Sequence, residues 1–482
     1  MSLTLALSSS LSGLKLAARG TQVVADNIAN AQTGAYGVRS LTQAARMTGS
    51  TGSGVAMTGI RRDVDQALLG ELRTARSRDL GEDIRLAFWN STETAIGLPG
   101  QPGSLTGLVD RLEAALQKAS ADPASPAHLA QVVQSAGEIS QHFRMVNQSL
   151  VLARDQADAA IAKSAIRLND ALESVASLND RIQRQTLLGG APESLKDERQ
   201  RVVDQISDMV SIRQFDREDD RIMLMGADGT ILVDRKAAVV SFERSYMPDA
   251  NEKVEDGTLG LMRINGQAIS PESVLFATGQ IGANFYVRDV AAPEVQAQLD
   301  ALAADLTARF MVPDVDQSLA PDEFGLFALQ GHGAPASALA GISGRLILNP
   351  QLEGPGDTTW RLRNGLGMAA TPSGPVSDNT LLDRMLSALT AAQPLATGAQ
   401  RARSISGHSS DLLSMTATQR LGVEENKTIA AAQHAALNEA FAAKGVDTDK
   451  ELSNLLVLEQ AYAANARVIS TIDAMLRKLL EL

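Results

Sequence analysis

Apolar residues recur every three and four positions at both ends of this chain, and this heptad spacing constrains its fold more than any other feature. Near the N-terminus the repeating positions are Leu7, Leu11, Leu14, Ala18, Thr21, Ala25 and Ile28. Near the C-terminus they are Leu455, Leu458, Tyr462, Asn465, Ile469, Ile472, Leu476 and Leu479. Such spacing is typical of helices that supercoil with a partner. Because a lone amphipathic helix cannot bury its apolar stripe, we expect the two terminal helices to lie side by side.

Two further heptad runs, over residues 129–150 and 161–182, together with the helical stretch "SLTGLVDRLEAALQKA" before them, predict a rod of antiparallel helices. The joint "SADPASPAH" before the heptad runs contains a Ser-Pro step, which is typical of a helix end followed by a new helix start. The period then changes, because residues 211–242 alternate polar and apolar side chains as strands do. The Gly-rich stretch 49–59 lacks the Gly-Lys-Ser/Thr of a phosphate loop, and we expect it to be a flexible segment.

These patterns predict a mainly α-helical fold with a smaller β-rich insertion. The terminal heptad helices are expected to pair as a coiled coil, next to a central antiparallel helical rod. The expected domains are a discontinuous terminal domain over 1–60 and 440–482, a rod domain with short strands and loops over 61–210 and 276–439, and an outer β-rich insertion over 211–275. The hairpin-like path of the chain places this insertion at the end of the molecule opposite the termini.

Composition excludes several classes of function. The net charge of −12 argues against nucleic acid as a partner, because phosphate binding needs a basic face. The chain has no cysteine, which rules out disulfides, thiolate metal sites and thiol nucleophiles. No stretch approaches the roughly 20 apolar residues of a membrane span, so we expect no membrane insertion. The N-terminus lacks a basic start and its apolar residues are interrupted by serines, so we expect no cleaved signal peptide.

No arrangement of side chains predicts catalysis. The five histidines are scattered without an HExxH pair, and no Gly-x-Ser-x-Gly motif occurs. The acidic residues mostly alternate with Arg and Lys along helices, as on a solvated helix face. We therefore expect no enzyme activity, no cofactor and no metal.

The stretch "NIANAQTGAY", residues 27–36, interrupts the first helical pattern. Nothing in it is acidic, basic or Gly-Lys-like, so it does not predict a metal or phosphate site. Thr33 and Gly34 are expected to stop the first helix, while Asn27 and Asn30 bond to exposed backbone groups and Tyr36 packs on a neighbour. Farther along, Asn465 lies within an otherwise apolar stripe. It would either set the register of a coiled coil or face solvent on a helix that does not supercoil.

The same stretch resembles the Asn-x-x-Asn-x-x-Thr-x-Gly-Tyr loop of bacterial flagellar axial proteins, although Gly34-Ala35 stands where that family usually has Pro-Gly. The segment "ELSNLLVLEQAYAANARVIS" resembles their C-terminal helix. Two interior blocks resemble the hook-associated protein 1 family within this group. The first comprises Leu195, Asp197, Arg199, Ile206 and Ser207, and the second Gly279, Gly282, Arg288, Asp289, Pro293, Gln298, Leu299, Asp300, Leu302 and Ala303.

The resemblance implies a structural subunit at the hook–filament junction of the flagellum, outside the cell. It further implies export through the flagellar type III apparatus, with a cytosolic chaperone bound to the C-terminal helix. The implied partners are other copies of the chain in a helical layer, the hook protein, and the second hook-associated protein. The expected assembly interface comprises Leu7, Leu11, Leu14, Asn27, Asn30, Tyr36, Leu455, Leu458, Tyr462, Asn465, Ile469, Ile472, Leu476 and Leu479.

Two alternatives share part of the pattern. A hook or distal-rod axial protein would share both ends of the chain but not the interior blocks. An extracellular coiled-coil adhesin would share the heptads but not the paired end motifs.

Overall fold

The computed structural model describes residues 3–480 except 49–50, 99, 247–249, 251, 255, 313, 321–322, 332–339, 355–356, 369–371, 373 and 396–400. Its helices are α1 Leu3–Ala29, α2 Gln66–Ile96, α3 Leu105–Ala121, α4 Pro126–Leu187, α5 Glu193–Met209, α6 Gln280–Tyr286, α7 Ala292–Phe310, α8 Ile342–Arg345, α9 Arg361–Asn364, α10 Thr380–Thr390, α11 Ile405–Ala442 and α12 Thr448–Leu480. Its strands are β1 Val38–Thr48, β2 Thr51–Asp63, β3 Ile212–Asp216, β4 Ile222–Gly226, β5 Ile231–Val233, β6 Val240–Phe242, β7 Met262–Ile264, β8 Gln267–Ile269, β9 Phe327–Leu329 and β10 Leu346–Leu348.

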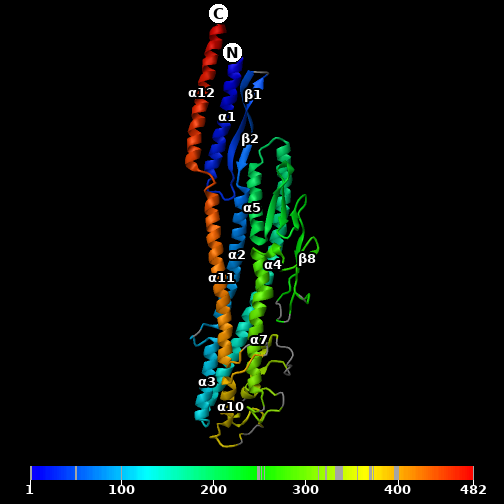
Figure 1. Cartoon of the computed structure of the whole chain (residues 1–482), viewed down its shortest axis with the longest axis vertical. Coiled ribbons are helices and arrows are strands. Elements are labelled where there is room, and N and C mark those ends of the chain that lie inside the picture. Colours follow the sequence, from blue (N-terminus) through cyan, green and yellow to red (C-terminus); the bar gives the residue numbers. More distant parts are fainter. Residues whose placement is uncertain are drawn as a thin grey trace.

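The molecule is long and narrow, with both termini at one end (Figure 1). At that end lie α1, α12 and the hairpin of β1 and β2, while α3 and α10 lie at the other. Between the two ends α11 runs antiparallel to α2. Lys427 of α11 forms ion pairs with two residues of α2, Asp79 at 2.7 Å and Asp83 at 2.6 Å. The predicted fold class is confirmed: the protein is mainly α-helical with smaller antiparallel sheets.

Helix α4 is the longest element, and it joins the two predicted heptad runs into one unbroken helix of 62 residues. Its start follows the predicted Ser-Pro step, since Ser125 is the N-cap and accepts a hydrogen bond from the His128 backbone N–H. Buried apolar side chains follow one face from Leu129 to Ile182. At 1.5 Å per residue the helix is about 90 Å long, so its two halves meet different neighbours.

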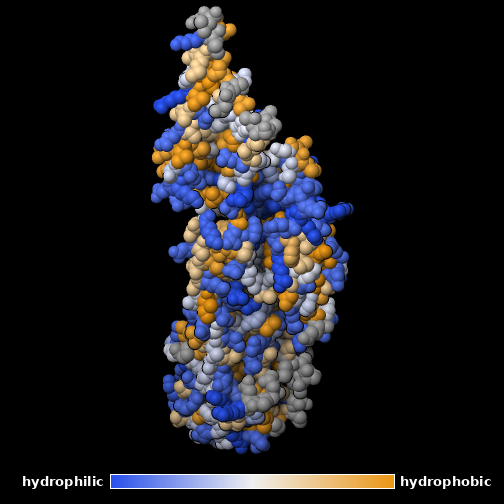
Figure 2. Space-filling model, turned by 45° about the horizontal axis from the view of Figure 1, so that its top comes forward, coloured by the Kyte–Doolittle hydropathy of each residue, from blue (hydrophilic) through white to orange (hydrophobic). Residues whose placement is uncertain are grey.

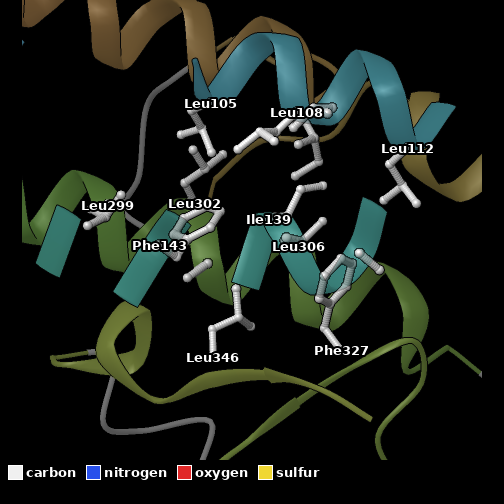
Figure 3. Packing of buried hydrophobic residues seen from close by; sticks show 14 of the residues in the cluster. Leu105, Leu108, Leu112, Ile139, Phe143, Leu299, Leu302, Leu306, Phe327 and Leu346 are labelled. Atoms are coloured by element: carbon white, nitrogen blue, oxygen red, sulfur yellow. The ribbon is translucent and has the colours of Figure 1, made fainter. Parts of the chain in front are cut away.

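The first half of α4 contributes to the core at the end of the molecule opposite the termini. Figure 3 shows this core, in which α3, α4 and α7 meet with the strands β9 and β10. The side chains labelled there are Leu105, Leu108, Leu112, Ile139, Phe143, Leu299, Leu302, Leu306, Phe327 and Leu346. This layered packing buries the heptad face that the sequence predicts for α4.

The second half of α4 carries the β-rich part, which comprises the three-stranded sheets β3-β4-β5 and β6-β7-β8. Two asparagines of α4 hold one strand of each sheet. The Asn179 side chain donates to the Ile222 carbonyl at 2.8 Å and accepts from the Ile222 N–H at 3.2 Å. Asn169 accepts from the Val240 N–H at 2.7 Å. Each amide therefore satisfies strand backbone that the sheet leaves unpaired.

The position of these sheets differs from the expectation that they occupy the end opposite the termini. They lie beside α4 at mid-length (Figure 1). The reason is the length of α4, which carries the chain back toward the termini before α5 begins. The strands that follow α5 consequently meet the second half of α4 rather than its start.

A buried polar cluster separates the two cores along α4. Asp158 and Arg288 are both fully buried and form an ion pair of 2.6 Å, and Arg288 also pairs with Asp289 at 2.7 Å. Arg154 donates to the Arg288 carbonyl at 3.1 Å. The Arg-Asp step lies in a π-helical turn, Val287–Ala291, just before Pro293, whose missing N–H removes one helical hydrogen bond. A buried ion pair of this kind depends on every member being hydrogen-bonded.

We predict that Phe143→Ala lowers the free energy of unfolding by about 3–5 kcal/mol, because it leaves a cavity in the α3–α4–α7 core. The matched control is Met145→Ala, two residues along the same helix, since Met145 is 52% exposed whereas Phe143 is fully buried. Urea unfolding followed by helical circular dichroism measures both. Equal midpoints for the two variants would contradict this account of the core.

Candidate assembly interface

Helices α1 and α12 lie antiparallel, because Gly13 faces Asn465 whereas Gly20 faces Leu458. A Cβ at Gly13 would lie 2.8 Å from the Asn465 amide, and one at Gly20 would lie 2.8 Å from a Leu458 methyl group. With Ser10 and Ala17, these glycines form a row of small residues along α1 at heptad spacing. The small side chains let the two helix backbones approach closely.

The face that α1 buries is offset by one residue from the predicted seam. The buried positions are Ser10, Ala17, Gly20, Val23, Val24 and Asn27. By contrast, Leu11 is 46% exposed, and Leu7 and Leu14 are half-buried. The physical reason is that close packing here selects small residues, which carry little of the hydrophobic signal used to identify a seam. Part of the predicted leucine stripe therefore remains at the surface.

On α12 the predicted stripe divides into a covered and an uncovered part. Ile472 is buried, and Leu455, Leu458, Asn465 and Ile469 are half-buried. Tyr462 and Leu476 are exposed, and the side chain of Leu479 lies outside the described residues. The amide of Asn465 donates to the Ala461 carbonyl of its own helix at 2.9 Å. It therefore packs over Gly13 without making a polar pair across the two helices.

A long β-hairpin takes the place of the expected flexible segment at 49–59. Strand β2 pairs with β1 from Val38↔Asp63 to Thr48↔Thr51, with two irregularities, and packs on α1. Gly54 has a φ of +110° and lies so close to Ser12 that no Cβ would fit there. The Ser12 hydroxyl accepts a hydrogen bond of 3.1 Å from the Val55 N–H. The expectation was wrong for the described residues 51–59, because they form a strand and Gly54 packs closely on α1; residues 49–50 lie outside the described residues.

Asn27 joins α1 to the hairpin from inside the protein. It is fully buried, and its amide mimics a strand: Nδ2 donates to the Arg39 carbonyl at 2.9 Å and Oδ1 accepts from the Arg39 N–H at 3.1 Å. Oδ1 also accepts from the Tyr36 hydroxyl at 2.8 Å. The contacts of Asn27 are therefore made within its own chain, and it bonds to strand backbone rather than to the helix end.

The loop between α1 and the hairpin contains a tight turn. It is not the helix stop expected at Thr33-Gly34, because α1 already ends at Ala29. The Tyr36 N–H donates to the Thr33 carbonyl at 3.2 Å, which closes a four-residue turn. Ala35, its third residue, has a φ of +64°, a conformation that glycine adopts without strain. Asn30 does bond to the helix end as expected, since its amide donates to the Asp26 carbonyl at 2.8 Å.

The residues 27–39, which link α1 to the hairpin, are called the joint. Asp197 of α5 connects this joint to the rod. Its carboxylate accepts from the Gly37 N–H at 3.0 Å and pairs with Arg39 and Arg62 at 2.7 Å each. Arg39 also lies over the Tyr36 ring, 4.8 Å from its centroid. Burial raises the pKa of Tyr36 to about 12. The sequence motif that contains Asp197 therefore holds the terminal part of the chain on the rod.

Apolar surface remains exposed at the narrow end of the molecule, where Figure 2 shows orange patches. On α12 the exposed apolar residues are Leu452, Leu456, Val457, Tyr462, Val468, Met475, Leu476 and Leu480. Val457, Val468 and Met475 share one side of the helix, which flanks the side that packs on α1. Leu11 of α1 and Met47 and Met57 of the hairpin add to this surface.

Among the described helices, none combines the length and the apolar composition of a membrane span. Nor do any three His, Asp or Glu side chains within the described ranges form a group that could hold a metal ion.

Comparison with known proteins places the chain in a flagellar family. Residues 94–311 match the model of the flagellar hook-associated protein FlgK helical domain, and residues 439–482 match that of the flagellar basal body rod FlgEFG protein C-terminal region. Flagellar hook-associated protein 1 of Bacillus subtilis is 21% identical, with the alignment covering 95% of this chain and 94% of that protein. The chain belongs to the FlgK family of flagellar hook-associated proteins. This is a family of structural components of the flagellum, not of enzymes.

Other relatives of this FlgK-family chain match it over a shorter range. The hook-associated protein 1 of Salmonella typhimurium is 25% identical over 56% of this chain and 49% of its own length. The Escherichia coli protein is 24% identical over 57% of this chain and 51% of its own length. This chain thus spans about half the length of these two relatives. The solved structure of the flagellar hook junction protein FlgK from Burkholderia pseudomallei is 16% identical over 54% of this chain, with a TM-score of 0.46.

We predict that Asn27→Ala destabilises the joint, because it leaves the Arg39 backbone groups and the Tyr36 hydroxyl without their partner. The expected cost is about 2–3 kcal/mol, which corresponds to roughly 30- to 160-fold faster amide exchange around Arg39. Hydrogen–deuterium exchange of peptides that cover 36–45 measures this. The control is Asn30→Ala, which removes a bond to the helix end and a long, exposed one from Thr33, and should change exchange far less. Equal effects would rule out the bridging role of Asn27.

We also predict that Ala35→Gly stabilises the turn by about 1 kcal/mol, because glycine relieves the positive φ. The matched control is Ala31→Gly in the same loop, where φ is ordinary and added freedom in the unfolded chain should destabilise. Hydrogen exchange at 36–39 should therefore slow in the first variant and quicken in the second. Faster exchange in both would mean that Ala35 is not strained.

Proposed function

We propose that this protein is the structural subunit of the hook–filament junction and that it assembles through its terminal helices into a helical layer of identical copies. One observation carries the proposal: the paired terminal helices leave many apolar side chains uncovered along α12, whereas α4 buries the apolar side chains of its heptad face. A second copy that covered this surface would stabilise the assembly by roughly 25 cal/mol per Å² of apolar area buried. This agrees with the family, whose members are parts of the flagellum.

Within this proposal the predicted interface residues divide by their position. Leu11, Tyr462 and Leu476 are exposed and would meet a neighbouring copy directly. Ile472 and the half-buried stripe residues of α12 would instead hold α1 and α12 together as one unit. Asn27 and Tyr36 would act through the joint, by fixing the direction of the terminal pair relative to the rod.

The remaining proposed partners follow from the same position in the flagellum. The hook protein would lie below the layer and the second hook-associated protein above it. We propose that the subunit reaches this extracellular site through the type III export apparatus without a cleaved signal peptide. A cytosolic chaperone that covered the C-terminal helix beforehand would keep its apolar surface from aggregating.

Two substitutions on the uncovered side of α12 test the assembly role. The double variant Val457→Glu and Val468→Glu should fold normally, because both side chains are exposed, yet fail to restore filaments in a strain that lacks the native protein. Removal of residues 452–482 should have the same effect on filaments. The readouts are the urea unfolding midpoint, filament counts by electron microscopy, and the amount of protein in isolated hooks.

The control variant is Gln460→Glu, which adds a charge to an exposed polar position on another side of α12. It should restore filaments. Normal filaments from the double variant, or from the truncated protein, would sink the assembly proposal. Recovery of the native protein along the filament, rather than at the hook end of flagella stripped of filament, would sink the junction role.

A further inference from the structure

A basic cavity lies beside the joint although the chain as a whole is acidic. It has a volume of about 500 Å³ and is enclosed by β2, the first turns of α2, α5, and the strands β3 and β4 with their connection. Seven lysine or arginine side chains and three carboxylates line it. The chain has a net charge of −12, yet cationic side chains outnumber carboxylates around this cavity. This local excess of positive charge attracts anions.

Most of these cations already have partners inside the protein. Arg62 pairs with Asp197, Lys196 pairs with Asp220 at 2.8 Å, and Arg199 donates to the Asn179 side chain at 2.8 Å. Burial lowers the pKa of Arg199 to about 10. These groups supply positive potential to the cavity, while their N–H groups are largely committed elsewhere.

Arg73 differs from them, because it is buried and incompletely bonded. It is 8% exposed, its Nε pairs with Asp204 at 2.7 Å, and its Nη1 donates to the Gln214 side chain at 3.0 Å. Its buried Nη2 has no hydrogen-bond partner among the described residues. Arg73 also lines a neighbouring cavity of about 720 Å³ between α2, β3 and α11. A buried guanidinium N–H without an acceptor is costly, and it marks a place where an acceptor can bind.

Two more residues that line the cavity carry a buried polar atom without a partner in the described part of the chain. One such atom is Nε of Arg221, whose Nη2 donates to the Asp234 carbonyl at 3.1 Å. The other is Oε2 of Glu193, at the start of α5. The two donors suit an oxyanion, either phosphate or a carboxylate, whose oxygens would accept from the two arginines. Hydrogen phosphate would in addition donate its hydroxyl to Glu193, which an ionised carboxylate cannot do.

We propose that this cavity is an oxyanion-binding site, in which Arg73 and Arg221 are the ligand-contacting residues. The anion comes either from solution, as phosphate, or from an acidic side chain of a neighbouring copy. Bound there, it would tie α2 to the strand region next to the joint. The site does not depend on the junction role proposed above, since its lining belongs to one chain.

Isothermal titration calorimetry of the full chain with sodium phosphate tests the site, with chloride used to hold ionic strength constant. We expect saturable one-to-one binding that weakens at least tenfold in Arg73→Gln and in Arg221→Gln. The matched control is Arg76→Gln: Arg76 forms a similar α2–α5 ion pair, with Asp208 at 2.9 Å, but does not line the cavity. It should leave the affinity unchanged.

Absence of saturable binding to the native protein, or equal weakening in Arg76→Gln, overturns the proposal. Should Arg73→Gln fail to fold, Arg221→Gln alone decides, because Arg221 makes no ion pair with α5. Sedimentation velocity at high protein concentration separates the two sources of the anion. If phosphate and Arg221→Gln both reduce self-association, the ligand is a neighbour's carboxylate. If neither changes it while phosphate binds, the ligand is the free anion.

Discussion

The buried stripe along α4 is the constraint on which the rest of this structure depends. Both hydrophobic cores use it: one gathers α3, α7 and the strands β9 and β10 on its first half, and the other gathers α5 and the two three-stranded sheets on its second. In proteins most of the stability of a helix comes from such tertiary packing of its apolar face. The polar cluster around Asp158 and Arg288 lies at the boundary between the two cores. Hydrogen bonds as well as packing therefore fix the position of this boundary.

The joint at the narrow end follows a different rule. A loop that reverses the chain between a helix and a hairpin exposes backbone groups that need partners. Here Asn27 bonds both backbone groups of Arg39, and Asp197 collects the Gly37 N–H and two arginines. The bonds of Asp197 connect the terminal part of the chain to the rod, whereas those of Asn27 connect α1 to the hairpin. Together they support the role proposed for the joint, which is to fix the direction of the terminal pair relative to the rod.

Much of the fold could be predicted because periodicity reports which faces are buried. The heptads identified the terminal helices and the antiparallel rod, and alternation identified the strands after residue 211. The hairpin β1–β2 was missed because the apolar residues of "VRSLTQAA" are three apart rather than alternating, and because the glycines at 49–54 suggested flexibility. At the candidate interface the leucines drew attention, whereas the row Ser10, Gly13, Ala17 and Gly20 lies on the face that packs against α12. Small residues contribute little to hydrophobic periodicity. Only the tertiary structure shows that they allow α1 and α12 to pack closely.

The amino-acid sequence by itself determined the helical class, the pairing of the termini and the absence of cysteine chemistry, since each depends on residue type and spacing along one chain. The motif residues Asn27, Asp197 and Arg288 were also visible in the sequence. Their partners were not, because Asn27 bonds to Arg39 within its own chain segment whereas Asp197 and Arg288 pair with residues more than a hundred positions away. Only the tertiary structure decided these contacts, the offset of the α1 seam and the basic cavity, because each arises where separate elements meet.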